Sequence, residues 1–296
     1  MASIREMRLR IKSIKSLAQV TRALETVSAS KVRKAVQANQ ASRSYSEKAW
    51  KVLLHLARQP GHNNLHPLLN ERLEVRKILV ILISGDRGLA GSYNVNVLRN
   101  TLMYFDQFSQ PVDYICVGKK GRDLLLRKKA NVIAEFSELK NPANFIEISP
   151  INRLVIDDFL NEGHDQLYLS YTNFHTMTKQ ETMVRKILPL EVDFSGKSFN
   201  ATHKNGSSVF TYEPDQKELL DEIIPRFTAM QIYQSVLSSQ ASEHAARMIA
   251  MSNATENANE LVGLLQLEYN KARQQSITND MLDIVGGAAA QTQSGR

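Results

Sequence analysis

Residues 4–35 read IREMRLRIKSIKSLAQVTRALETVSASKVRKA, and this stretch decides the fold class. It contains neither glycine nor proline and is rich in Ala, Leu, Lys, Arg and Glu, which favour helices. Mostly apolar or small side chains recur at alternating three- and four-residue steps, so they share one helical face. These seam positions are Ile4, Met7, Ile11, Ile14, Ala18, Thr21 and Glu25. The stretch therefore predicts a long helix with one face packed on a partner helix.

The same composition extends from Met1 to Gln59, where Pro60-Gly61 is expected to end the helix. A second helical pattern runs from Pro214 to Val285, interrupted only by Pro225 and Gly263. We expect Pro225 to kink this helix or set its start, and Gly286-Gly287 to end it. Residues 1–58 carry thirteen Lys and Arg against three acids, whereas 214–296 carry six against ten. The two terminal helices therefore complement each other in charge.

The middle of the chain has a different texture, in which short apolar runs alternate with helical patterns. The expected strands are Lys77–Ser84, Val112–Gly118, Val132–Phe136, Gln166–Phe174, Met183–Leu190 and Ser208–Tyr212. Helices are expected at Asn94–Phe108, Gly121–Lys129 and Asn152–Asn161. This alternation predicts a mostly parallel sheet covered by helices. We therefore expect an α/β domain over 74–213, inserted between terminal helices at 1–59 and 214–296.

Composition limits the classes of function. The formal charge of +7 is compatible with nucleic acid, an anionic surface or acidic protein partners. The single cysteine, Cys116, cannot form an internal disulfide or a multi-cysteine zinc site. The longest apolar run, Ile78–Ser84, is far shorter than the roughly 20 residues that cross a bilayer. No membrane span is expected.

The turn at 84–92 is the most enzyme-like motif, because it follows a strand and precedes a helix. It reads SGDRGLAGS and lacks the lysine of a phosphate-binding P-loop, and the Rossmann glycine spacing also fails. We expect a tight turn in which glycines supply positive φ angles. His62 and His66 fall at a helix break, and the adjacent pairs Asp157-Asp158 and Asp221-Glu222 diverge on helices. No catalytic, cofactor or metal site is therefore expected.

A nucleic-acid-binding coiled coil is the alternative reading. Arg5, Arg8, Arg10, Lys12 and Lys15 form a basic run that suits contacts to phosphates. The apolar seam of the same helix demands a helical partner, however, and few aromatic side chains are available to stack on bases.

Three separated blocks resemble the gamma subunits of F-type (rotary) ATP synthases. The first is Ile11–Leu24 with Val27–Ala35, and the second is the Asp86-Arg87-Gly88-Leu89-Ala90-Gly91 turn with Asn94. The third runs from Ser242–Met248 through Ala254–Ala258 and Tyr269–Gln274 to Ile277-Thr278 and Asp283–Ala288. The resemblance covers essentially the whole chain. Leu24 and Ala90 stand where the family often has Met and Cys.

This resemblance implies an antiparallel coiled coil of the two terminal helices with an inserted α/β (Rossmann-like) foot domain. It implies a non-catalytic central rotor stalk that transmits torque between a membrane c-ring and a catalytic hexamer of alpha and beta subunits. An epsilon subunit is a further implied partner. Arg273, Gln274 and Thr278 are the implied contacts to a beta-subunit loop. Arg22, Leu24 and Arg247 are implied to lie near an acidic beta-subunit lever.

The resemblance also implies a location. The match begins within the first dozen residues, so we expect no transit peptide and a peripheral protein on the cytoplasmic side of a bacterial membrane. The inserted dithiol loop of plastid members has no counterpart, because Cys116 is the only thiol.

Overall fold

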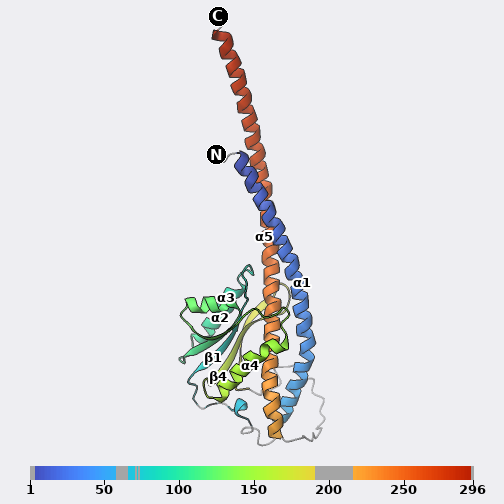
Figure 1. Ribbon diagram of the computed structural model, residues 1–296, viewed down its shortest axis with the longest axis vertical. Helices are drawn as coiled ribbons and strands as arrows, with labels where there is room; N and C mark the ends of the chain where they lie inside the picture. The colour runs from blue at the N-terminus through green and yellow to red at the C-terminus, as the bar shows by residue number, and fades with distance from the viewer. Residues whose placement is uncertain (1–3, 58–65, 71, 73, 191–215, 295–296) are drawn as a thin grey trace. The chain divides into compact units, whose positions relative to one another are not determined.

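A computed structural model describes residues 4–57, 66–70, 72, 74–190 and 216–294; at 44–47, 50–57, 216–219 and 287–294 it gives the helical backbone alone (Figure 1). The chain divides into two compact units, Ser28–Arg247 and the combination of Met1–Val27 with Met248–Arg296. The two long helices, α1 (Ile4–Ala57) and α5 (Gln216–Ser294), each contribute to both units.

The unit Ser28–Arg247 is built around a five-stranded sheet with the order β3-β2-β1-β4-β5. Its strands are β1 (Ile78–Ile83), β2 (Val112–Val117), β3 (Asn131–Phe136), β4 (Gln166–Phe174) and β5 (Gln180–Leu188). The first four pair in parallel, and β5 pairs antiparallel to β4. The predicted α/β layering is confirmed, and the expected strand at 208–212 lies outside the described residues.

Both faces of the sheet are covered by helices, which is why β1 is buried along its whole length. Leu79, Ile81 and Ile83 point to the face covered by α4 (Phe145–Leu160) and α5. Ile78 and Val80 point to the opposite face, covered by α2 (Tyr93–Phe105) and α3 (Lys119–Arg127). A parallel strand buried on both sides carries apolar residues at every position rather than at alternate ones.

Helix α4 begins seven residues before the predicted start at Asn152. A capping box explains the difference: the side chain of Asn144 accepts from the backbone of Glu147, and the Glu147 carboxylate accepts from the backbone N–H of Asn144. This reciprocal pair satisfies two helix-start donors and outweighs the single proline, Pro150, inside the helix.

Within the same unit, the part of α1 after Ser28 runs antiparallel to the first part of α5. Lys31 lies close enough to Glu243 and His244 to influence their pKa values. Further along α1, Asn39 and Arg43 share a cavity with residues 227–238 of α5. Rising numbers on α1 therefore meet falling numbers on α5.

The second unit pairs the start of α1 with the distal part of α5. Its centre is a buried hydrogen bond of 2.7 Å between the hydroxyls of Thr21 and Thr255, flanked by the buried Ala18 and Ala258. Half-buried residues continue the seam on both helices: Ile14, Ile11 and Met7 on α1, and Val262, Leu265 and Tyr269 on α5. The seam predicted from the sequence is thus the packed face of this helix pair.

The predicted end of α5 was wrong. The helix passes through Gly286-Gly287 and ends at Ser294, and Pro225 lies inside the helix rather than at its start. Two helical glycines cost about 1 kcal/mol each, which the three alanines that follow partly offset.

Pro60-Gly61 and Pro214 lie outside the described residues. No helix among the described residues has an apolar stretch that meets the requirements for crossing a membrane.

Candidate functional site

The turn that follows β1 is fastened at its start by two side chains of the predicted signature. Asn94 Oδ1 accepts a hydrogen bond of 2.8 Å from the backbone N–H of Gly85. The carboxylate of Asp86 accepts from the backbone N–H groups of Lys119 and Glu138, at 3.1 and 3.0 Å. Asn94 therefore ties the turn to α2, and Asp86 ties it to the beginning of α3 and to the loop after β3.

The turn also rests against α5, and Gly85 makes that approach possible. A Cβ atom at Gly85 would lie 2.7 Å from the side-chain carboxyl of Glu243, closer than a real contact allows. The expectation that glycines supply positive φ is confirmed at Gly91, where φ is 56°, and is wrong at Gly85 and Gly88. Leu89 also has a positive φ of 61°, although it is not a glycine, and its side chain is 66% exposed.

Arg247 of α5 holds the middle of the turn. Its guanidinium donates to the carbonyl oxygen of Gly88, at 3.3 Å from Nε and 3.2 Å from Nη2, and to that of Arg87 at 3.4 Å. Nη2 also lies 2.5 Å from Oε1 of Glu243, and both side chains are nearly buried. One buried cation thus joins a carboxylate on its own helix to two carbonyls 159 and 160 residues away in sequence.

Burial shapes the protonation of the groups around Arg247. It raises the pKa of Glu243, and the positive charge of Arg247 opposes that rise. Burial lowers the pKa of His244 to about 3, with Arg247 as the second cause, so His244 is neutral near pH 7. Neutral His244 accepts at Nδ1 from Arg247 Nη1 at 3.0 Å.

The other nitrogen of His244 fixes the loop after β3. Because Nδ1 accepts, Nε2 carries the proton, and it contacts the side-chain amide of Asn141. That amide satisfies the N–H when its oxygen faces the ring, which also gives the buried Asn141 Oδ1 a partner. Glu243, His244 and Arg247 therefore form one network that links α5 to two loops of the α/β domain.

Three serines of α5 bind the backbone of β4. Ser238 and Ser239 accept from the N–H groups of Phe174 and Thr172, at 2.8 and 3.2 Å. Ser242 donates to the carbonyl of Thr172 at 3.2 Å. This role of the serines was not predicted from the sequence. The only sign of it in the sequence is the repetition of serine at 238, 239 and 242. No local pattern identifies the strand that these serines bind.

The structure separates the predicted contact residues into two environments. Arg22, Arg273, Gln274 and Thr278 belong to the unit of paired helix ends and are exposed; Leu24 in that unit is half-buried. The hydroxyl of Thr278 donates to the carbonyl of Gln274, so its local bond is satisfied. Arg247 belongs to the other unit, where it is buried and used by groups of this chain.

The distal part of α5 also exposes large apolar side chains that the sequence analysis did not single out. They are Leu264, Leu267, Ile277, Met281, Leu282, Ile284 and Val285, each between 51% and 72% exposed. Runs of exposed apolar side chains of this kind mark surfaces that another protein covers.

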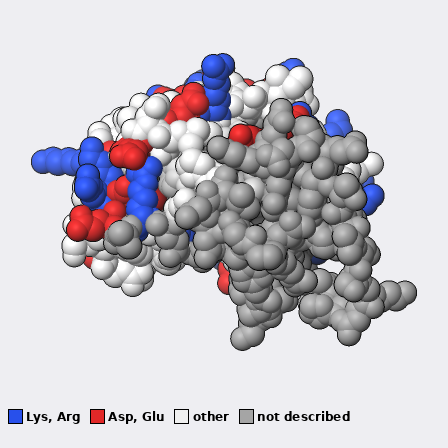
Figure 2. Space-filling model, turned by 90° about the horizontal axis from the view of Figure 1, so that it is seen from below, with Lys and Arg blue, Asp and Glu red and all other residues white. Residues whose placement is uncertain are grey.

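The face of the molecule drawn in Figure 2 gives no support to the alternative of nucleic-acid binding. On the face in Figure 2, blue Lys and Arg side chains lie among red Asp and Glu side chains rather than in a patch of one sign. The seam of the basic helix is occupied by α5, as the apolar spacing required.

Comparisons with known proteins agree with the sequence blocks. The family model for ATP synthase matches residues 3–291. The chain is 42% identical to the ATP synthase gamma chain of Dehalococcoides mccartyi (strain ATCC BAA-2266 / KCTC 15142 / 195), over 98% of this chain and 99% of that protein. It is 39% identical to the gamma chain of Roseiflexus sp. (strain RS-1), again over 98% and 99%.

Solved structures share the fold. A chain in the cryo-EM structure of Euglena gracilis mitochondrial ATP synthase, OSCP/F1/c-ring, matches with a TM-score of 0.68 at 19% identity, covering 99% of this chain and 96% of that one. A chain of the central stalk/c-ring structure from Tetrahymena thermophila matches with a TM-score of 0.58 at 23% identity, covering 79% and 99%. On the sequence identity along its whole length, the chain belongs to the ATP synthase gamma-chain family, the non-catalytic central-stalk subunits of F-type ATP synthases.

Proposed function

We propose that this chain transmits torque between a membrane c-ring and a catalytic hexamer of alpha and beta subunits. The observation that carries the proposal is the antiparallel pairing of the two chain ends, centred on the Thr21–Thr255 hydrogen bond. Two packed helices resist twisting better than one, which a shaft under torque requires. In this proposal 1–59 and 214–296 are the shaft and 74–213 is the foot.

The mechanism rests on asymmetry. A shaft inside a ring of three catalytic sites presents a different face to each of them and so favours a different conformation of each. Turning the shaft then cycles the affinities of the three sites in order. Exposed charged contacts are individually weak, about 0–1 kcal/mol each, so they let the surfaces slide without a deep minimum.

The exposed residues of the paired helix ends are the proposed contacts to the hexamer. Arg273, Gln274 and Thr278 face solvent on α5, next to the exposed apolar side chains from Leu264 to Val285. On α1, we propose that the exposed Arg22 and the half-buried Leu24 lie near the acidic beta-subunit lever. A protein sleeve around this part of α5 would cover the apolar side chains and leave the polar ones to contact a beta-subunit loop.

Arg247 is buried, so we propose that it affects the beta-subunit lever indirectly. Its guanidinium is engaged with Gly88, Arg87 and Glu243, and it fixes the turn that displays the exposed Arg87 and Leu89. In this proposal Arg247 is a positioning residue, because it holds that turn in place.

The foot is the proposed platform for the c-ring and an epsilon subunit. Solved structures of similar fold from Euglena gracilis and Tetrahymena thermophila are of assemblies that include the c-ring. The similar gamma chains named above come from bacteria, which supports a peripheral position on the cytoplasmic side of a bacterial membrane.

Reconstitution tests the proposal. The purified chain by itself should hydrolyse no ATP, and it should raise the ATPase activity of a mixture of alpha and beta subunits. A variant with both Thr21 and Thr255 changed to Lys, which places two like charges in the helix seam, should not restore activity. Hydrolysis by the isolated chain, or full restoration by the double lysine variant, would refute the shaft model.

A further inference from the structure

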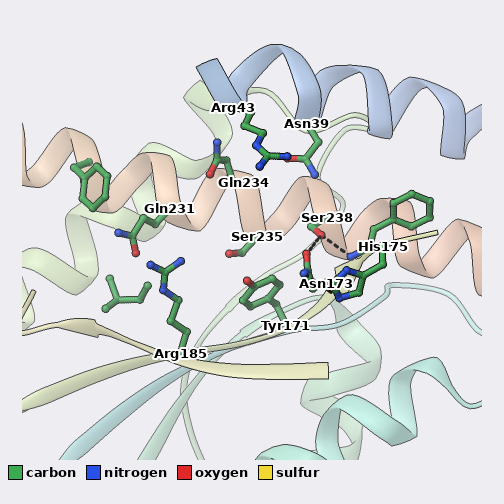
Figure 3. Close-up of a pocket in the computed structure, with 13 residues that line it drawn as sticks. Asn39, Arg43, Tyr171, Asn173, His175, Arg185, Gln231, Gln234, Ser235 and Ser238 are labelled. Atoms are coloured by element: carbon green, nitrogen blue, oxygen red, sulfur yellow. Dashed lines mark hydrogen bonds between the residues drawn. The ribbon is translucent and has the colours of Figure 1, made fainter. Parts of the chain in front are cut away.

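A cavity of about 360 Å³ lies within Ser28–Arg247, among α1, the β4–β5 side of the sheet and α5 (Figure 3). Asn39 and Arg43 enter it from α1, Tyr171 and Arg185 from the strands, and Gln231 and Ser235 from α5. Its volume falls within the range of small-ligand pockets, roughly 300–1,000 Å³. Torque transmission makes no use of it.

Three of the cavity's polar side chains are buried and unpartnered. Tyr171, Gln231 and Ser235 are only 9%, 8% and 7% exposed, and in the described part of the chain none of their side chains makes a hydrogen bond. Figure 3 shows Tyr171 and Ser235 turned toward each other across the space, with Gln231 facing Arg185. Buried polar groups almost always have partners, so the contents of the cavity must supply them.

The charges of the side chains that line the cavity indicate the charge of a ligand that would bind there. Arg43 and Arg185 bring two guanidinium groups, and no Asp or Glu is among the described residues that line the cavity. Half-buried Arg185 forms no ion pair with any described residue. Arg43 has an interaction of its own, and His175 is paired with Glu181, with 3.2 Å between Nε2 and Oε2. Arg185 is therefore the principal anchor.

We propose that this cavity is a binding site for a phosphate-type oxyanion, held by the guanidinium of Arg185 with Arg43, the amide of Gln231 and the hydroxyl of Ser235. A guanidinium donates two parallel hydrogen bonds to such an anion, and a tetrahedral oxyanion has acceptors left for donors from other directions. The donors here come from α1, β5 and α5, which surround the cavity on three sides.

The bound oxyanion has a structural consequence. It joins Arg43 of α1 to Arg185 of the edge strand β5, so it stabilises the packing of α1 on the α/β domain. The cavity is larger than a single phosphate. It therefore has room either for a free phosphate ion or for a phosphate that is part of a nucleotide. Both sources share the same anchor at Arg185.

Thermal unfolding and calorimetric titration of the full chain test the site. Inorganic phosphate should bind with a stoichiometry of one, and the unfolding midpoint should rise by about 2–4 °C for each tenfold increase in phosphate above its Kd. Arg185→Gln removes one charge-assisted anchor and should weaken binding about tenfold or more. Gln231→Leu keeps all the charges but removes a donor, and it should weaken binding severalfold.

Controls separate a built site from general attraction of anions to a basic protein. Arg153→Gln makes the same change on the exposed surface of α4, where the side chain is 86% exposed, and should leave binding unchanged. Circular dichroism should show that each variant folds. Competition between ADP and phosphate would identify a nucleotide as the source, and binding of phosphate but not ADP would identify the free ion.

Three results would overturn the proposal. They are the absence of phosphate binding, equal weakening by Arg153→Gln and Arg185→Gln, and chloride binding as tightly as phosphate. The first would mean that the cavity holds water alone, and the other two would mean that the attraction is diffuse.

Discussion

Replacing Arg247 with Met should destabilise the unit Ser28–Arg247 severely, because Arg247 is the only cation in the network that contacts Glu243 among the described residues. The change removes hydrogen bonds to Gly88, Arg87, Glu243 and His244 together. Breaking a buried ion pair by removing one partner costs about 3–5 kcal/mol. We expect a loss in that range at pH 8.

The loss should depend on pH, and the sign follows from Glu243. Burial raises the pKa of Glu243 in the folded chain, and without Arg247 the pKa rises further because the opposing charge is gone. A carboxyl with a raised folded pKa contributes stability at low pH that is lost as pH rises through that pKa. The loss in free energy of unfolding caused by Arg247→Met should therefore be smaller at pH 5 than at pH 8.

Urea unfolding followed by circular dichroism measures this difference across the pH range. Arg226→Met is the matched control, because Arg226 forms an exposed pair with Glu222 on the same helix, with side chains 65% and 61% exposed. It should cost no more than about 0.5 kcal/mol. The double variant Arg247→Met with Glu243→Leu should recover part of the stability, since no buried charge is left unpaired. A loss below about 1 kcal/mol at pH 8, or a double variant less stable than Arg247→Met, would refute the reasoning.

Three further predictions concern His244, Gly85 and the pair Arg273 and Gln274. His244 is neutral in the folded chain down to about pH 3, so the unfolded state binds the extra proton below pH 6.5. His244→Gln should therefore flatten the loss of stability between pH 6.5 and pH 3 by on the order of 3 kcal/mol in urea unfolding; unchanged pH dependence would contradict this. Gly85→Ala should cost about 1–3 kcal/mol by the same measurement, because the added Cβ meets the carboxyl of Glu243 at 2.7 Å, and an unchanged midpoint would be evidence against that close contact. Changing Arg273 and Gln274 together to Glu should alter the unfolding free energy by no more than about 0.5 kcal/mol, because both are exposed, yet it should impair ATP synthesis by the assembled complex. An equal effect on stability and synthesis would count against a partner contact.

The sequence was sufficient for the features that depend on local spacing. The seam from Ile4 to Thr21 was visible because a helix repeats its faces every three to four residues. The strand at 78–83 was visible because a strand buried on both faces is apolar throughout. Both signals lie within a window of fewer than twenty residues.

The contacts that hold the site together could not be predicted from local sequence patterns. Arg247 reaches Gly88 across 159 residues, and Ser242 reaches Thr172 across 70, so no local pattern pairs them. Arg247 could be singled out only by resemblance, and its burial could not be foreseen, because an arginine on a polar helical stretch usually faces solvent. The end of α5 was misjudged because glycine is a statistical rather than an absolute helix terminator.

Helix α5 changes its surroundings along its length, and this change connects fold to function. Between Leu220 and Arg247 most of its side chains are buried, between Met251 and Ala258 only one face is, and from Leu264 to Val285 large apolar side chains face solvent. Fully burying a Leu, Ile or Val side chain contributes about 1.5–3 kcal/mol. Side chains that are 51–72% exposed therefore leave roughly half of that contribution unrealised in the isolated chain. A surrounding protein that buries them gains this free energy at every rotational position only if it offers a smooth apolar surface, since specific polar pairs would favour one angle over the others. The exposed apolar end of α5 is thus the part of the chain best suited to be held and still turn.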